Sequence, residues 1–165
     1  MPPDLAIHLV PQIEEIQREL SQRRETVSTA ESCTGGLLAS WLTQLPGSSA
    51  VYLGGVSAYA NSVKQQVLHV DQKLLNNYGA VSPEVAQAMA ASIRKLTGST
   101  YALSITGIAG PGGGTAEKPV GTVFCGIASP RGVRFVHLGL SGDRDSIRHQ
   151  SAQRAIAELK EEIPK

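Results

Sequence analysis

A strand that passes through one tight turn directly into a helix constrains the fold of this chain most. The run Thr26–Thr29 favours a β-strand, and the turn Ala30–Gly36 (AESCTGG) leads from it into an apolar helical pattern that ends near Leu45. Glycines in such a turn let another molecule approach the backbone, and the first N–H groups of a helix have no intrahelical acceptor. These N–H groups, at the positive end of the helix dipole, can hold an oxyanion or a phosphate.

Runs of strand length alternate with helical patterns along the rest of the chain. Five runs are typical of strands: 26–30, 51–60, 101–106, 121–129 and 133–140. Helical patterns start at six places: Pro2-Pro3-Asp4, Leu37, Asn61, Asp71, Ser82 and Asp143. The link Ser129–Gly132 is so short that it predicts an antiparallel hairpin between the last two strands. This order predicts an α/β fold, a three-layer α/β/α sandwich with a mixed, mostly parallel sheet.

Length and composition favour a single globular domain over residues 1–165. The chain carries 15 basic and 14 acidic side chains, and its net charge of +1 provides no strong field for nucleic acid or a membrane surface. No basic leader opens the chain, and no run is long enough to cross a membrane. Cys33 and Cys125 are the only cysteines, without the spacing of a zinc site, so we expect no metal and a reducing, cytoplasmic setting.

Three loops are predicted at the carboxyl ends of parallel strands, where α/β folds bind ligands: Glu31–Gly36, Tyr59–Lys64 and Gly107–Thr115. Ser32 in the first loop is a candidate nucleophile, although an ordinary N-cap role for Ser32 or Thr34 is the commoner reason for such residues. Cys33 is either a rival nucleophile or a small buried residue. Glu31 either acts as an acid/base group or orients Lys64 or a backbone amide.

The second loop holds Tyr59 at the end of a strand and Lys64 in the first turn of a helix that Asn61 is predicted to cap. The helix dipole disfavours a cation there and burial lowers the pKa of an amine, so Lys64 becomes a usable base. A Ser–Lys pair assisted by a hydroxyl activates serine without histidine, which favours a joint role for Ser32, Lys64 and Tyr59. The alternative is a surface lysine beside a core tyrosine.

The glycine-rich third loop, which follows Thr106, fits neither the P-loop nor the dinucleotide-binding fingerprint. It either forms a nest of backbone amides for an anion or is a long flexible turn. Thr106 either bonds a ligand at the strand end or is structural. Arg144 and Arg148, about one turn apart in the last helix, either reach an anionic ligand or are solvated or paired with neighbouring aspartates.

Three motifs in this order, AESCTGG, YANSVK and SITGIAGPGGG with PVGTVF, resemble the CinA C-terminal domain family over roughly residues 5–160. Its enzymatic members are nicotinamide mononucleotide deamidases of the PncC type. The resemblance implies a three-layer α/β/α fold and hydrolysis of nicotinamide mononucleotide to nicotinic acid mononucleotide and ammonia, a step of pyridine nucleotide salvage in NAD metabolism that needs no metal or cofactor. Longer members add an N-terminal domain, for which this chain has no room.

Carried over to this sequence, the resemblance makes Ser32 the nucleophile, with Tyr59 and Lys64 as its activating partners. It also places three residues against the substrate: Asn61, Thr106 and Gly107. The expected partner is therefore a small nucleotide, with no nucleic acid and no membrane, and we expect the chain to form a homo-oligomer, a dimer.

Backbone amides complete the predicted site. Those of the first loop, at Cys33, Gly35 and Gly36, are predicted to hold the developing oxyanion, and those of the glycine loop to bind the phosphate together with Arg144. Two other functions remain open at this point. One is a non-catalytic nucleotide-binding module of the same fold, which a ligand would stabilise without forming product. The other is a cysteine amidase that acts through Cys33 and is inactivated by thiol alkylation.

Overall fold

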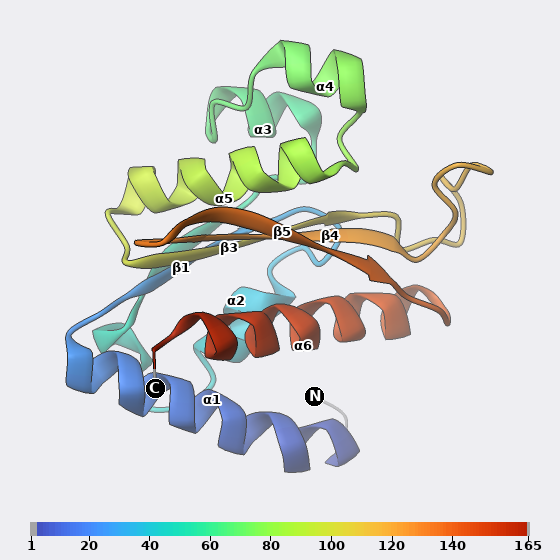
Figure 1. The fold of residues 1–165 in the computed structure, drawn as a ribbon. Coiled ribbons are helices and arrows are strands. Elements are labelled where there is room, and N and C mark those ends of the chain that lie inside the picture. The colour runs from blue at the N-terminus through green and yellow to red at the C-terminus, as the bar shows by residue number, and fades with distance from the viewer. Residues whose placement is uncertain (1–2, 165) are drawn as a thin grey trace.

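The structure, a computed structural model, describes residues 3–164, with side chains from Leu9 onward, and shows one five-stranded sheet between two layers of helices (Figure 1). The strands are β1 (Val27–Glu31), β2 (Tyr52–Ser57), β3 (Tyr101–Gly107), β4 (Thr122–Ser129) and β5 (Gly132–Gly139). The helices are α1 (Pro3–Arg23), α2 (Leu37–Leu42), α3 (Asn61–Gln66), α4 (Gln72–Tyr78), α5 (Pro83–Thr97) and α6 (Arg144–Glu162), with a 3-10 turn η1 (Ser48–Ala50).

The strands lie in the order β2-β1-β3-β4-β5. β1 pairs in parallel with β2 and β3, whereas β4 pairs antiparallel with β3 and β5. All strands except β4 therefore point the same way, which confirms the predicted mixed, mostly parallel sheet and its terminal hairpin. Every residue of the interior strand β1 is buried, as expected for a parallel strand that is covered on both faces.

The helices form two layers: α5 covers one face of the sheet, with α3 and α4 on the same side beyond it, and α1, α2 and α6 lie on the other side (Figure 1). Each face has its own cluster of buried apolar side chains, so the predicted three-layer sandwich is confirmed. Helix α5 approaches the sheet closely at Gly126, where an added Cβ would lie 2.3 Å from the carbonyl oxygen of Ala86. Only glycine allows this packing distance.

Side-chain caps fix three helix starts at the residues that the sequence predicted: Asp71 for α4, Ser82 for α5 and Asp143 for α6. The predicted cap of α3 is wrong, because Asn61 is the first helical residue and Ala60 precedes it without a capping side chain. Asn61 is therefore left to face the loops at the sheet edge. Of the helix start predicted at Pro2-Pro3-Asp4, Pro2 lies outside the described residues, and α1 is helical from Pro3. Within residues 3–164, no helix is both long and apolar enough to cross a membrane.

Candidate functional site

The three predicted loops meet at the carboxyl ends of β1, β2 and β3 and enclose a pocket of about 280 Å³. Eight of the predicted site residues line this pocket: Ser32, Cys33, Tyr59, Asn61, Lys64, Thr106, Gly107 and Arg144. Gly35 and Gly36 do not line it. The topology explains the convergence, because adjacent parallel strands end at the same edge of the sheet.

The centre of the pocket is a direct contact between Ser32 and Lys64, whose Nζ lies 3.0 Å from the serine Oγ. Lys64 is only 1% exposed, and its amine also donates to the main-chain carbonyls of Ala58 (2.7 Å) and Tyr59 (3.2 Å). No ion pair involves Lys64 among the side chains that the structure describes. Burial therefore lowers the pKa of Lys64 below its ordinary value of 10.5, which the nearby Cys33 only partly opposes.

This arrangement suits a neutral amine. The two hydrogens of a neutral Lys64 amine satisfy the carbonyls of Ala58 and Tyr59, and its lone pair is then free to accept the hydroxyl hydrogen of Ser32. Nucleophile and base are therefore within hydrogen-bond distance, the geometry that general-base activation of serine requires. The chemistry this supports is acyl transfer.

The carboxylate of Glu31, at the end of β1, caps the N-terminus of α2. It is buried and accepts hydrogen bonds from the main-chain N–H groups of Gly36 (3.0 Å), Leu38 (3.1 Å) and Ala39 (2.8 Å). Of the roles the sequence left open for Glu31, the structure shows the orientation of backbone amides. Helix α2 has no other side-chain cap, since Gly36 precedes it in a left-handed conformation, and Glu31 satisfies the N–H groups that would otherwise lack acceptors.

The amides predicted to hold the oxyanion must consequently be reassigned. The N–H of Gly36 binds Glu31, and the N–H of Gly35 donates to the carbonyl of Ser32 at 3.1 Å. Within the described chain, the N–H groups of Cys33 and Thr34 have no acceptor. Cys33 lines the pocket, whereas Thr34 is fully buried and does not, so of the predicted amides only that of Cys33 remains free beside Ser32.

Cys33 lines the pocket but remains a thiol. Its side chain is buried, and burial raises its pKa to about 11. A thiol with so high a pKa is almost entirely protonated at neutral pH and is a poor nucleophile. This weighs against the cysteine-amidase alternative.

Tyr59 and Arg144 form the outer wall. The Arg144 guanidinium donates to the Tyr59 hydroxyl (2.8 Å) and to the carbonyl of Gly110 in the glycine loop (2.7 Å). Tyr59 is 59% exposed, and only its main-chain carbonyl bonds Lys64. Among the described residues, the phenol has no hydrogen bond to Ser32 or Lys64, and the activating role expected of Tyr59 stays a prediction.

The remaining predicted residues line the floor and the mouth. Thr106 is buried and donates from Oγ1 to the carbonyl of Ala80 at 2.7 Å, which holds the start of the glycine loop against the segment before α5. Gly107 cannot carry a side chain, because an added Cβ would lie 2.6 Å from the Val123 side chain. Asn61 is exposed at the mouth of the pocket.

Sequence reasoning missed the segment before α5. Ala80 and Val81 line the pocket, and Lys118 ties them to the glycine loop by donating to the carbonyls of Tyr78 and Val81, both at 2.8 Å. A lone lysine in a Gly/Pro-rich loop gives no local signal of such a contact. Among the described side chains, no three His, Cys, Asp or Glu residues lie close enough to hold a metal ion.

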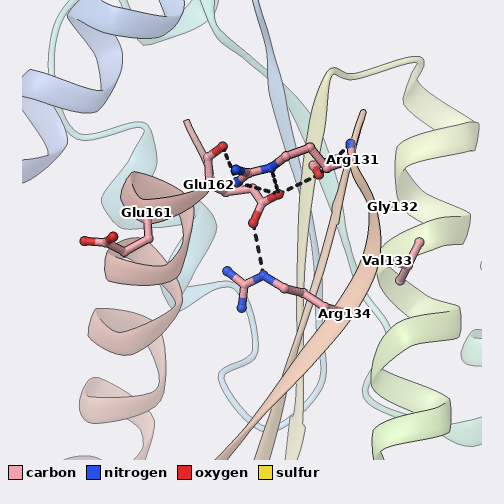
Figure 2. Close-up of a pocket in the computed structure, with 7 residues that line it drawn as sticks. Arg131, Gly132, Val133, Arg134, Glu161 and Glu162 are labelled. Atoms are coloured by element: carbon pink, nitrogen blue, oxygen red, sulfur yellow. Dashed lines mark hydrogen bonds and ion pairs between the residues drawn. The ribbon is translucent and has the colours of Figure 1, made fainter. Parts of the chain in front are cut away.

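A larger hollow of about 400 Å³ lies at the far end of α6, where that helix meets the β4–β5 hairpin. Figure 2 shows the Glu162 carboxylate held there between Arg131 and Arg134, with Glu161 pointing away. Glu162 accepts from Ser129 (2.6 Å), Arg131 (3.0 Å) and Arg134 (3.0 Å). The buried Glu162 and both arginines of this hollow are paired with groups of opposite charge, so we assign it a structural role and place the functional site at Ser32.

Comparison with known proteins identifies the family of this chain. Residues 11–163 match the family described as the CinA C-terminal domain. A "CinA-like protein" of Desulfotalea psychrophila is 50% identical over 141 residues, which cover 86% of this chain and 34% of the relative. Another, of Geotalea uraniireducens, is 56% identical over 123 residues, which cover 74% of this chain and 29% of the relative. The chain thus spans about a third of the length of such relatives.

Solved structures are similar over nearly the whole chain. The competence/damage inducible protein CihA of Agrobacterium tumefaciens has a TM-score of 0.85 and 39% identity, covering 91% of this chain and 94% of that one. A competence-damaged protein (CinA) superfamily protein of Klebsiella pneumoniae has a TM-score of 0.90 and 32% identity, covering 94% and 98%. These names describe competence and damage and state no reaction.

Proposed function

The chain belongs to the CinA C-terminal domain family, and from this premise we propose that it is an amidohydrolase that converts nicotinamide mononucleotide to nicotinic acid mononucleotide and ammonia. The observation that carries the proposal is the 3.0 Å contact between the Ser32 hydroxyl and the buried Lys64 amine in a pocket at the sheet edge. A nucleotide-binding module alone would have no need of a nucleophile and a base in contact. We further propose that it works in the cytoplasm, in pyridine nucleotide salvage, as a homodimer.

In the acylation step, neutral Lys64 takes the hydroxyl proton of Ser32 as Oγ forms a bond to the carboxamide carbon. The N–H group of Cys33, which lines the pocket, stabilises the oxyanion, an effect worth about 3 kcal/mol for one such donor in well-studied hydrolases. Protonated Lys64 then donates its proton to the amide nitrogen, the C–N bond breaks and ammonia leaves. The acyl group remains on Ser32 as an ester.

In the deacylation step, neutral Lys64 takes a proton from water while the water oxygen attacks the ester carbon. The tetrahedral intermediate collapses, the C–Oγ bond breaks, and Ser32 recovers its proton from Lys64. We assign Tyr59 to the orientation of Arg144 and to the pocket wall, because its hydroxyl contacts that guanidinium.

Recognition of the phosphate is assigned to the opposite end of the pocket. No acidic side chain lines the pocket within the described chain. There the glycine-loop N–H groups at Ala109, Gly110, Gly112 and Gly113 have no acceptor among residues 3–164. Arg144 lies beside them at Gly110. Amides and a guanidinium of this kind bind phosphate oxygens well, and Asn61 lines the same pocket.

Release of ammonia from nicotinamide mononucleotide tests the proposal. The wild-type protein should release ammonia, Ser32→Ala should not, and Ser40→Ala, an exposed serine in α2 near the turn, should match the wild type. Equal rates in the wild type and Ser32→Ala would refute the serine mechanism. Thermal stabilisation by the nucleotide without ammonia would instead favour the non-catalytic binding module.

A further inference from the structure

The amine of Lys64 is a buried basic group of the pocket, and no counter-ion for its protonated form lies beside it among the described side chains. Its acceptors are a hydroxyl and two main-chain carbonyls, and no carboxylate lies within ion-pair distance among the described side chains. A buried ammonium without an anionic partner carries a large desolvation cost. The position next to Ser32 Oγ is therefore where an anion would gain most from Lys64.

The proposed reaction creates an anion at that position. Ser32 attacks the carboxamide carbon, and hydrolysis turns this group into a carboxylate on the same carbon. The carboxylate then lies beside Lys64 Nζ, because Nζ is 3.0 Å from the attacking oxygen. The substrate carboxamide, in contrast, is neutral and is attached to a cationic ring.

We propose that the carboxylate product binds as the counter-ion of protonated Lys64, so that the protein takes up a proton when it binds product but not when it binds substrate. The inference rests on the proposed function and adds to it a control of the same site by its own product. Product is then retained more strongly as the pH falls, and turnover is most inhibited by product at the acidic end of the working range.

The other groups around Lys64 do not supply this charge. From β1, Glu31 is engaged by three N–H groups of α2, and from the turn that follows, Cys33 is held as a neutral thiol. From the β2–α3 link and α6, Tyr59 and Arg144 bond each other. The parts of β3, the glycine loop and the segment before α5 that line the pocket hold no titratable side chain, and neither does the rest of α3.

The direction of the pH dependence follows from linkage. An ammonium–carboxylate pair raises the pKa of Lys64 in the product complex above its value in the free protein, which burial has lowered. Product affinity therefore increases as the pH falls through the interval between these two pKa values and is constant below it. Proton uptake is largest within the interval. The cationic ring of the substrate acts in the opposite direction and favours the neutral amine.

Titration calorimetry tests the proposal in two buffers of different ionisation enthalpy. Nicotinic acid mononucleotide and nicotinamide mononucleotide are each bound to Ser32→Ala, which prevents turnover. Both ligands carry the same phosphate, so proton exchange by that group cancels in the comparison. We expect proton uptake with the acid in excess of that with the amide, and about tenfold tighter binding of the acid for each unit by which the pKa of Lys64 rises.

Two further variants identify the proton acceptor. Adding Lys64→Met should abolish the difference in proton uptake, whereas adding Lys95→Met, an exposed lysine in α5 outside the pocket, should preserve it. Equal uptake with both ligands, in a protein whose wild type releases ammonia, overturns the inference and leaves the proposed function intact. If the wild type releases no ammonia and neither nucleotide binds, both are overturned together.

Discussion

Two buried charges at opposite ends of the molecule show how the same physical cost can serve stability or chemistry. Glu162, at the end of α6, is 5% exposed and is surrounded by two guanidinium groups and a hydroxyl. Lys64, at the sheet edge, is 1% exposed and has only neutral acceptors. Burial alone would raise the pKa of Glu162, but the hydrogen bonds from Ser129, Arg134 and Arg131 outweigh it and lower the pKa.

The two groups differ in charge compensation: Glu162 has partners of opposite charge and Lys64 has none among the described side chains. This difference distinguishes the structural hollow from the functional pocket better than their volumes do. The hollow at Glu162 is the larger, at about 400 Å³ against 280 Å³ for the pocket at Ser32. The ion pairs of Glu162 favour its charged form and leave it with no proton to exchange near neutral pH. The isolated amine of Lys64 is pushed toward its neutral form and can accept a proton, which is the property that a general base needs.

The largest effect is expected when the unpaired amine of Lys64 is removed. Lys64→Met should lower the rate of ammonia release by about 10⁴-fold or more, because serine loses its base. The free energy of unfolding should stay the same or rise, since an unpaired buried cation is replaced by an apolar side chain of similar length. Ammonia release and denaturant unfolding measure the two effects, and a clear loss of stability would show that Lys64 is structural.

For Glu162, whose charge is paired, we expect a substitution to lower stability and to leave ammonia release unchanged. Glu162→Gln leaves Arg131 and Arg134 without their carboxylate and should lower the free energy of unfolding by about 2 kcal/mol, the loss expected for hydrogen bonds to a charged group. Because both arginines are partly exposed, water limits the cost. The rate of ammonia release per folded molecule should not change. Glu161→Gln, the exposed neighbour, is the matched control and should unfold like the wild type.

The pH dependence of stability sharpens the comparison, since the two charges act at opposite ends of the pH range. The pKa of Glu162 is lowered from 4.5 in the folded protein, so its contribution is present above that value and is lost as the pH falls through the folded pKa. The pKa of Lys64 is lowered from 10.5, so the folded protein is penalised below its folded pKa and recovers as the pH rises toward 10.5.

Each effect amounts to about 1.4 kcal/mol for every unit of pKa shift. Unfolding of the wild type should therefore approach that of Lys64→Met as the solution becomes alkaline, and approach that of Glu162→Gln as it becomes acidic. Denaturant unfolding across the pH range measures both trends. A stability gap between wild type and Lys64→Met that stays constant with pH would mean that Lys64 does not titrate as its burial requires.

Local patterns explain what the sequence could predict. Strand runs, helix caps such as Asp71 and Ser82, and the convergence of Ser32 with Lys64 follow from periodicity, capping chemistry and the rule that parallel strands end at one edge. The direction of the Tyr59 hydroxyl could not be predicted, because it depends on Arg144, 85 residues away in the sequence. The hydrogen bonds from the first N–H groups of α2 to the Glu31 carboxylate could not be predicted either. The sequence indicates where the helix starts but not that these N–H groups already have an acceptor.

The smallest expected effect concerns Cys33, the one group that could supply a counter-ion from within the protein. If this thiol ionised, its thiolate would compensate Lys64, and the contrast with Glu162 would disappear. Burial instead raises the pKa of Cys33 to about 11, so the thiol is neutral near neutral pH. Cys33→Ala should therefore change the rate of ammonia release by less than about twofold, as expected of a small buried residue rather than a nucleophile.

Alkylation provides the matching measurement. Cys125 is fully buried with a pKa raised to about 12, so Cys125→Ala leaves Cys33 as the only thiol and Cys33→Ala leaves Cys125 as the only one. Both single-cysteine proteins should react slowly with iodoacetamide at neutral pH, because the thiolate is the reactive form. Fast alkylation of Cys33 with loss of ammonia release would show instead that Lys64 has a thiolate partner. Lys64, the proposed base, would then be paired with the Cys33 thiolate. A product carboxylate would not be needed as its counter-ion.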